Sequence, residues 1–395
     1  MKLPDKEPEI SVGIMSAPRI RFELSGMFDM SADGQGDLTY TPRTPGCRFT
    51  LPDVTIGKGF HWQRNEPQRF AGALKIISDG RMQTAVNIIG LEEYLKSVIS
   101  SEMSAQASAP LLEAHAIVSR SWLLAMLARR GGNDINRIEL AGDVPETIVW
   151  HDRAEHRLFD VCADDHCQRY QGVTRQTTPA VAAAVEATRG MVLTYAGEIC
   201  DARFSKCCGG VTEEFQTCWE DAPKPYLASL PDRADGDDRD FCDTADARLI
   251  SQVLNSYDRE HPGFYRWEAV LDADTLPALL RRKTGLDFGR IKALRPLSRG
   301  KSGRISRLLI EGERHSHIIG KELEIRLALS ESCLRSSAFD VEPLPDGSFR
   351  LRGRGWGHGV GMCQIGAAVM GDRGYTARQI VAHYFPHTEI TTLYQ

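Results

Sequence analysis

The stretch from Leu91 to Arg130 constrains the fold of this chain more than any other. Its first part has apolar residues at the spacing of one face of an amphipathic helix, namely Leu91, Tyr94, Leu95 and Val98. Glu102 continues that face past its apolar end. A carboxyl group in such a place is paired, caps a helix or is functional, and a dry setting favours the protonated form that acid catalysis needs. A capping or ion-paired glutamate is the commoner case.

A second helix is predicted to follow the Ser- and Ala-rich run 104–109. Ser108 has the residue type of an N-cap, and Pro110 fits the first helical turn. The apolar positions that come next are typical of a buried helix, and Arg120 lies among them.

Two further patterns predict the surrounding secondary structure. Residues 10–28 alternate as half-buried strands do, and residues 69–89 read as a hairpin around Asp79 and Gly80. Helices are predicted at 179–189, 275–283, 321–329 and 376–384, with strands between them. We therefore expect an α+β fold in which an N-terminal β region leads into a helix pair, with mixed sheets and a smaller middle lobe.

Length and composition bound the organisation of the chain. Its 395 residues can form about two or three domains. We expect an N-terminal β region at 1–90, a core with the helix pair at 91–240, a middle scaffold or small lobe at 241–345, and a C-terminal block at 346–395 that completes the core. A net charge of −5 gives no support to a nucleic-acid partner. No run reaches the length of a membrane helix. The polar N-terminus has no secretory signal, so one was removed or none existed.

A second chemical cluster lies between residues 151 and 167. His156, Cys162, His166 and Cys167 supply two thiols and two imidazoles, the ligand types that tetrahedral zinc takes. The spacing is not that of a standard zinc finger, and free thiols beside surface histidines are the alternative. His166 and Cys167 are neighbours, so His151 or water could replace His166 as the fourth ligand.

The Gly-rich run from Gly353 to Gly361 does not fit a phosphate-binding loop, because no helix that begins with Lys-Ser or Lys-Thr follows it. Glycines here are better explained by a close approach of the backbone to a ligand or to another chain segment. His358 and Gln364 would then present polar atoms.

Two separated blocks together resemble one known family. The first comprises Leu91-Glu92-x-Tyr94-Leu95, Ser101-Glu102-Met103 and the run from Glu113 to Trp122; the second comprises residues 353–367, Gly374-Tyr375-Thr376 and His383-Tyr384-Phe385-Pro386. In this order they are similar to the stage II sporulation protein D (SpoIID/LytB) family.

The resemblance implies roles for particular residues. Glu102 matches the catalytic position, and His156, Cys162, His166 and Cys167 match a zinc-binding segment found in some members. The predicted substrate-binding residues are Arg120, Ser205, Gly209, Gly210, Thr212, Arg354, His358 and Gln364. Cys207 and Cys208 depart from the family pattern, which has hydroxyl residues there. We expect them to be buried thiols; a contribution to a second metal, or pairing with Cys200 or Cys218, is the alternative.

The function that the resemblance implies is that of a peptidoglycan lytic transglycosylase with Glu102 as both acid and base. The substrate would be glycan strands without stem peptides, which an amidase supplies, and the place of action would be the cell envelope. The first alternative is a non-catalytic, glycan-binding enhancer of an N-acetylmuramoyl-L-alanine amidase. The second is a zinc hydrolase, but two cysteines and two histidines close the coordination sphere and favour a structural metal.

Overall fold

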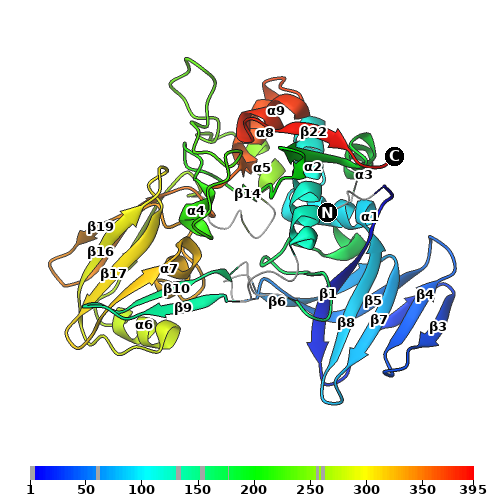
Figure 1. Ribbon diagram of the computed structural model, residues 1–395, viewed down its shortest axis with the longest axis horizontal. Coiled ribbons are helices and arrows are strands. Elements are labelled where there is room, and N and C mark those ends of the chain that lie inside the picture. Colours follow the sequence, from blue (N-terminus) through cyan, green and yellow to red (C-terminus); the bar gives the residue numbers. More distant parts are fainter. Residues whose placement is uncertain are drawn as a thin grey trace. The chain divides into compact units, whose positions relative to one another are not determined.

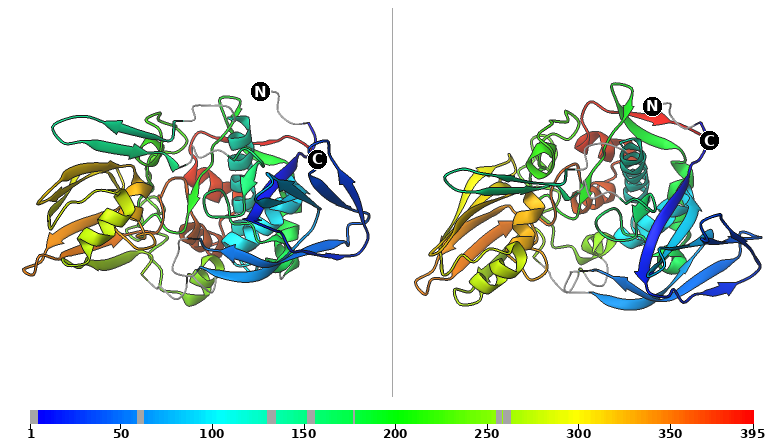
Figure 2. Two further views of the ribbon diagram at one scale, coloured as in Figure 1. Left: turned by 90° about the horizontal axis from the view of Figure 1, so that it is seen from below. Right: turned by 60° about the horizontal axis from the view of Figure 1, so that its bottom comes forward.

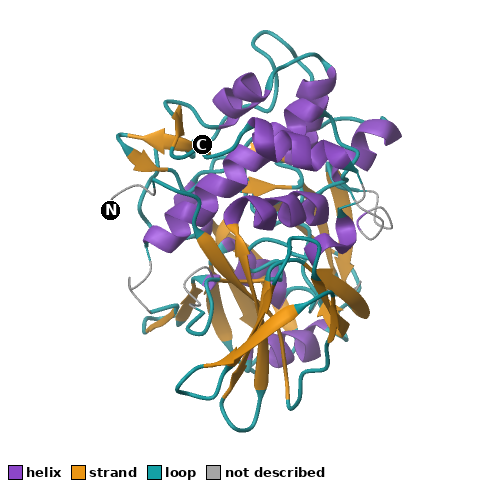
Figure 3. Ribbon diagram, turned by 90° about the vertical axis from the view of Figure 1, so that its right-hand side faces the viewer, coloured by secondary structure: helices purple, strands orange, loops and turns teal. Residues whose placement is uncertain are grey.

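A computed structural model describes residues 5–58, 63–129, 135–151, 156–176, 178–254, 258 and 263–395. The chain divides into two compact units (Figure 1). Unit 1 comprises Met1–Arg130, Glu155–Asp201 and Ile390–Gln395, and unit 2 comprises Gly131–Ala154 and Ala202–Glu389. The units interleave along the chain, so they differ from the four consecutive ranges expected from the sequence. Both units mix helices and strands (Figure 3), which confirms the α+β class.

Unit 1 is built on a six-stranded sheet in the order β11-β1-β8-β7-β4-β3. These strands are β1 (Glu9–Ala17), β3 (Phe28–Ala32), β4 (Leu38–Pro42), β7 (Ala73–Ser78), β8 (Gln83–Gly90) and β11 (Val161–Cys162). A second sheet joins β2 (Glu23–Ser25), β5 (Arg48–Ile56) and β6 (Arg64–Phe70), and a third joins β12 (Met191–Tyr195), β13 (Glu198–Ile199) and β22 (Glu389–Thr392). The hairpin predicted around Asp79 and Gly80 is confirmed as the β7–β8 pair.

The helices of unit 1 are α1 (Leu91–Glu102), α2 (Ala109–Ala128) and α3 (Pro179–Ala187), with the short 3-10 helix η2 (Gly172–Arg175). Strand β8 runs directly into α1, so the sheet fixes where that helix begins. Ser108 is the N-cap residue of α2, as predicted. Among the described residues, α2 alone is long and apolar enough to cross a membrane, and 78% of its most apolar window is buried inside the structure.

Unit 2 holds a five-stranded sheet in the order β16-β17-β18-β10-β9 and a three-stranded sheet in the order β15-β20-β19. The first comprises β9 (Arg137–Leu140), β10 (Glu146–Val149), β16 (Ile291–Arg299), β17 (Ile305–Gly312) and β18 (Ser316–Gly320). The second comprises β15 (Arg266–Leu271), β19 (Phe339–Pro343) and β20 (Phe349–Arg354). A short parallel pair joins β14 (Phe204–Ser205) to β21 (Met362–Cys363).

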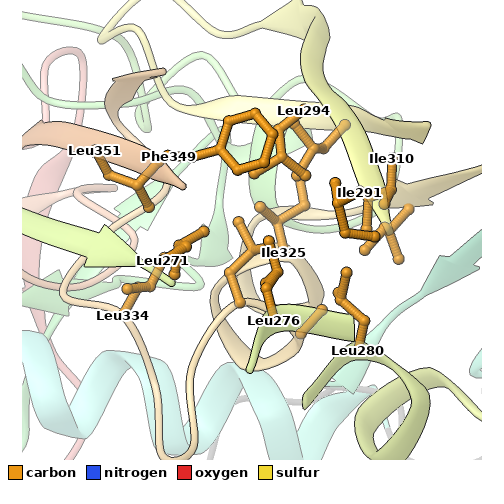
Figure 4. Packing of buried hydrophobic residues seen from close by; sticks show 14 of the residues in the cluster. Leu271, Leu276, Leu280, Ile291, Leu294, Ile310, Ile325, Leu334, Phe349 and Leu351 are labelled. Carbon is orange, nitrogen blue, oxygen red and sulfur yellow. The ribbon is translucent and has the colours of Figure 1, made fainter. Parts of the chain in front are cut away.

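The helices of unit 2 are α4 (Phe215–Cys218), α5 (Ala247–Val253), α6 (Leu276–Thr284), α7 (Glu322–Ala328), α8 (Gln364–Asp372) and α9 (Ala377–Tyr384). Helix α6 lies along the strands coloured yellow and orange (Figure 2). Its Leu276 and Leu280 point toward Ile291 and Ile325 in a closely packed apolar cluster (Figure 4). This cluster gives unit 2 a hydrophobic core of its own.

Candidate functional site

Glu102 ends helix α1 and is almost buried, with 8% of its surface exposed. The backbone N–H of Arg169 donates to its Oε1 at 3.0 Å. Partial negative charge at the C-terminal end of a helix favours the uncharged carboxyl group, whereas an N–H donor favours the carboxylate. The Arg169 N–H therefore stabilises the carboxylate form of Glu102.

The segment that holds Glu102 in place is Gln168–Gln171, which we call the strap. Besides the bond from Arg169, the backbone N–H of Gln171 donates to the hydroxyl groups of Ser97 and Ser101 at 3.2 Å each. The hydroxyl group of Tyr94 donates to the side chain of Gln168 at 3.2 Å. All these partners lie on α1, so the strap is held against this helix by hydrogen bonds.

The predicted metal ligands are brought together immediately before the strap. One donor atom each from His156, Cys162, His166 and Cys167 lies within 4.8 Å of the other three. Cys167 Sγ lies 3.4 Å from both His156 Nε2 and His166 Nδ1. Hydrogen bonds from Cys167, His156 and His166 lower the pKa of Cys162 to about 2. A thiolate, a second thiol and two imidazoles form a donor set that fits zinc.

The fold around this group of four explains its position. Cys162 belongs to β11, which pairs in parallel with β1 opposite Gly13. The Asp160 carboxylate accepts hydrogen bonds from the backbone N–H and hydroxyl group of Ser11 at 2.7 and 2.5 Å. His151, considered above as another ligand, belongs to unit 2 and has its Nε2 2.9 Å from Glu324.

Arg120 lies in a different setting from the one expected of a sugar-binding residue. Its side chain is fully buried, and it donates to Glu92 from Nε at 3.0 Å and from Nη2 at 2.6 Å. A third bond goes to the carbonyl oxygen of Met191 at 2.9 Å. Glu92 is only 3% exposed and also accepts a bond from Tyr394. These contacts give Arg120 a structural role.

The Gly-rich block surrounds a buried cation that sequence reasoning missed. Arg304 is fully buried and donates to the Gly357 carbonyl at 3.1 and 3.0 Å and to the Cys208 carbonyl at 3.2 Å. A Cβ atom at Gly359 would come within 2.3 Å of the Arg304 guanidinium, and Gly359 has a φ of +74°. These glycines were expected to allow a close approach of the backbone to a ligand or to another chain segment, and the structure shows the approach to another chain segment. Only the combination of one arginine elsewhere in the chain with a Gly-rich run could have indicated this buried contact in the sequence.

His358 lies inside this block and is held by the protein itself. Its Nδ1 accepts a hydrogen bond from the backbone N–H of Val360 at 3.0 Å. Its ring lies edge-on to the Trp219 ring, with 4.8 Å between the two ring centroids. Burial, and then the charges of Arg203 and Arg304, hold the pKa of His358 well below its usual range. The imidazole is therefore neutral near pH 7.

The remaining predicted substrate-binding residues all belong to unit 2 and have varied surroundings. Thr212 is buried and its hydroxyl group accepts a bond from Leu230 N–H at 2.8 Å. The hydroxyl oxygen of Ser205 is buried without a hydrogen-bond partner among the described residues. Arg354 lines a cavity of about 550 Å³ beside Trp267.

The other three predicted substrate-binding residues are Gly209, Gly210 and Gln364. Gly209 and Gly210 have φ values of +84° and +109°, and a Cβ atom at either would clash with Gly355 or Asp240. Gln364 is the first residue of α8 and is 1% exposed. Glu102 and the four candidate metal ligands belong to unit 1, so the candidate residues fall into two groups, one in each unit.

Comparison with known proteins finds sequence similarity around this site. The model of the stage II sporulation protein family matches residues 79–195, which include Glu102 and all four metal-binding residues. The model of a domain of unknown function, DUF8618, matches residues 213–361.

The chain is also similar to curated proteins over most of its length. It is 24% identical to stage II sporulation protein D of Bacillus amyloliquefaciens over 308 residues and 26% identical to that of Bacillus subtilis over 313 residues, covering 78% of this chain and 76% of the relative in each case. It is 24% identical to a Bacillus subtilis protein named amidase enhancer, covering 75% of this chain and 40% of the relative. The chain therefore resembles proteins of the SpoIID/LytB family over most of its length.

Proposed function

We propose that this chain is a peptidoglycan lytic transglycosylase that acts in the cell envelope on glycan strands lacking stem peptides. The observation that carries the proposal is the position of Glu102. A nearly buried carboxyl group ends α1 inside the matched family domain, and a backbone donor fixes one of its oxygens. The family names also support the coarser statement of a role related to the cell wall.

One carboxyl group is enough for this reaction. Glu102 donates its proton to the glycosidic oxygen as the bond from that oxygen to the sugar C1 breaks. The C6 hydroxyl of the same sugar then bonds to C1 and gives its proton to the Glu102 carboxylate. The products are a strand with a free hydroxyl and a strand with a 1,6-anhydro end, no water is consumed, and the acid is regenerated. Hydrolytic glycosidases instead use two carboxyl groups.

Arg169 assists this cycle through its backbone. Between the two proton transfers Glu102 is an anion, and the N–H that donates to Oε1 stabilises that form. Because the strap is covalently continuous with Cys167, zinc held by His156, Cys162, His166 and Cys167 would fix the strap against α1. The role of the metal would be to order the chain and not to react.

The test is digestion of glycan strands without stem peptides, with mass spectrometry of the released sugars. Glu102→Gln keeps the size and hydrogen bonding of the side chain but cannot transfer the proton. Release of anhydro ends should therefore fall by about 10²–10⁴-fold or more, whereas glycan binding should stay near normal. Glu93→Gln is the matched control, because Glu93 is on the same helix, is half exposed and pairs with Lys96. Retention of more than about a tenth of wild-type release in Glu102→Gln would exclude this mechanism.

The second candidate is a glycan-binding enhancer of an amidase. It is favoured by the similarity to the protein named amidase enhancer. In that case the wild-type chain would release no anhydro ends, and it would raise the rate at which a purified N-acetylmuramoyl-L-alanine amidase removes stem peptides. Glu102→Gln would leave this stimulation unchanged.

A further inference from the structure

A second group of metal-binding side chains lies in unit 2, distinct in sequence from the first. Cys208, Asp232, Cys242 and Cys363 each place a donor atom within 4.8 Å of the other three. All four residues are at most 2% exposed. They come from four separate chain segments, so the fold and not a local motif brings them together.

The spacing of the sulfur atoms suits a shared cation. In a tetrahedral zinc site with Zn–S bonds near 2.3 Å, two ligand sulfurs are about 3.8 Å apart. The Sγ atoms of Cys208 and Cys242 are 3.7 Å apart. A disulfide would need about 2.05 Å. The two thiols are therefore spaced as zinc ligands and not as a disulfide.

The groups around the four side chains resemble the outer shell of a metal site. Tyr384 donates its hydroxyl proton to Asp232 Oδ1 at 2.6 Å, and the Cys242 backbone N–H donates to Oδ2 at 2.9 Å. Each oxygen keeps a second lone pair, and carboxylate ligands are commonly oriented by such bonds. The backbone N–H of Cys208 donates to Cys363 Sγ at 3.3 Å, so that sulfur is already an acceptor.

Charge gives a further reason to expect a cation here. Asp232 is fully buried, and the hydrogen bonds that its carboxyl group accepts among the described residues come from Tyr384 and the Cys242 backbone. A buried carboxylate without a cation is costly unless it is paired or bound to a metal. Cys363 is the N-cap residue of α8, so this helix fixes its position next to Asp232.

The first turn of α8 is shaped to admit the carboxylate. A Cβ atom at Gly366 would lie 2.5 Å from Asp232 Oδ1 and 2.3 Å from the Tyr384 hydroxyl oxygen. Glycine at this position therefore allows Asp232 to approach the helix that begins at Cys363. The β14–β21 pair brings the segment that leads to Cys208 beside the segment that contains Cys363.

We propose that Cys208, Asp232, Cys242 and Cys363 bind a structural zinc ion that ties together four segments of unit 2. Three thiolates and one carboxylate complete a tetrahedral shell, and full burial leaves no open position for a substrate or reactive water. In the sequence, a contribution of Cys208 to a second metal was one of the alternatives, and under this proposal Cys208 has that role. Cys207, its neighbour, stays outside the group of four.

The decisive experiment isolates this site in the full-length chain, purified without a histidine tag or chelator. The double variant His156→Ala/Cys167→Ala removes two ligands of the first site. We expect wild type to carry about two zinc ions per chain and this variant about one, measured by elemental mass spectrometry. X-ray absorption at the zinc edge of the variant should then show three sulfur neighbours near 2.3 Å and one oxygen near 2.0–2.2 Å.

A second set of single variants assigns the ligands. Cys242→Ser should lose one zinc per chain, whereas Cys218→Ser should lose none, because Cys218 is buried in the same unit but lies outside the group of four. Cys207→Ser should also keep its zinc. If this variant instead loses one zinc per chain, Cys207 and not Asp232 is the fourth ligand, and the proposed ligand set is wrong. If Cys242→Ser does not fold, the measurements on the first-site variant still decide the matter.

Two results would overturn the proposal. One is a first-site double variant that folds and contains no zinc. The other is alkylation of denatured wild-type protein, followed by peptide mapping, that finds Cys208 and Cys242 joined in a disulfide. Neither result would bear on Glu102, so failure here is separate from failure of the proposed function.

Discussion

At the scale of single residues, the pair formed by Glu92 and Arg120 shows how a charged residue in an apolar pattern can be structural. Glu92 accepts two bonds from the guanidinium, one from Tyr394 and one from the Gly190 backbone N–H at 3.2 Å. Four donors converge on one buried carboxylate, so its charge is fully compensated. Glu102, which ends the same helix, accepts a hydrogen bond from a backbone N–H, that of Arg169.

The first prediction follows from this pair. Arg120→Ala leaves Glu92 buried without its cation, so the free energy of unfolding should fall by about 3–5 kcal/mol. Denaturant titration of the full chain measures the loss. Arg282→Ala, which breaks the exposed pair with Glu331, is the control and should cost about 0–1 kcal/mol.

The alternative for Arg120 is the sugar-binding role expected from the sequence. A stable Arg120→Ala protein with weakened glycan binding would favour that role and contradict the structural one. The double variant Glu92→Gln/Arg120→Met should recover part of the stability lost in Arg120→Ala, because it removes the uncompensated charge.

At the scale of elements, the strap links the first metal site to Glu102. Its two backbone donors to α1, from Arg169 and Gln171, both follow Cys167 by a few residues. If zinc orders this segment, its removal should loosen the strap before it unfolds the helix. Local opening of this kind is visible in amide exchange.

The second prediction concerns those two amides. In Cys162→Ser, hydrogen exchange at the backbone N–H groups of Arg169 and Gln171 should be faster than in wild type, whereas exchange in the β7–β8 pair should stay unchanged. Mass spectrometry of labelled peptides measures both. Unchanged exchange in the strap, in a variant shown to lack the first metal, would mean that the metal does not order it.

Local elements were the part of the fold that the sequence predicted well. Three such elements depend on residues that are close together in the sequence: the β7–β8 hairpin, α2 with its N-cap residue Ser108, and α9 with its capping box at Thr376 and Gln379. Helix periodicity and turn chemistry act over a few residues, so they can be read directly. The grouping of His156, Cys162, His166 and Cys167 was predicted from a short segment in the same way, and their donor atoms do lie within 4.8 Å of one another.

Long-range relations were the part that could not be predicted. Strand β10 pairs in parallel with β18, which joins Glu146 to Ile318 and makes the two units interleave. The buried Arg304 meets Gly357 across 53 positions, and Asp232 meets Tyr384 across 152. No periodicity within one segment records such pairings, because they arise only when several segments pack.

At the scale of the whole molecule, three histidines that are wholly or partly buried link stability to pH. Burial lowers the pKa of His358, His383 and His317 in the folded chain. The unfolded chain has an ordinary histidine pKa near 6.5 and takes up protons at a higher pH than the folded chain. Where the unfolded state binds more protons, stability rises with pH. The stability of this protein should therefore fall as the pH drops below about 6.5.

The last prediction isolates the share of His358, whose pKa burial lowers furthest below its usual range. His358→Gln keeps an acceptor for the Val360 N–H but cannot take up a proton in the unfolded chain. The free energy of unfolding of wild type should therefore decline between pH 6.5 and 5 more steeply than that of the variant, by at most about 1.4 kcal/mol per pH unit. Denaturant titrations at a series of pH values measure both slopes. Both proteins keep the same metal ligands, so acid release of metal cancels in the difference. Parallel curves would show that His358 is protonated equally in the folded and unfolded chains, against the burial seen around its ring.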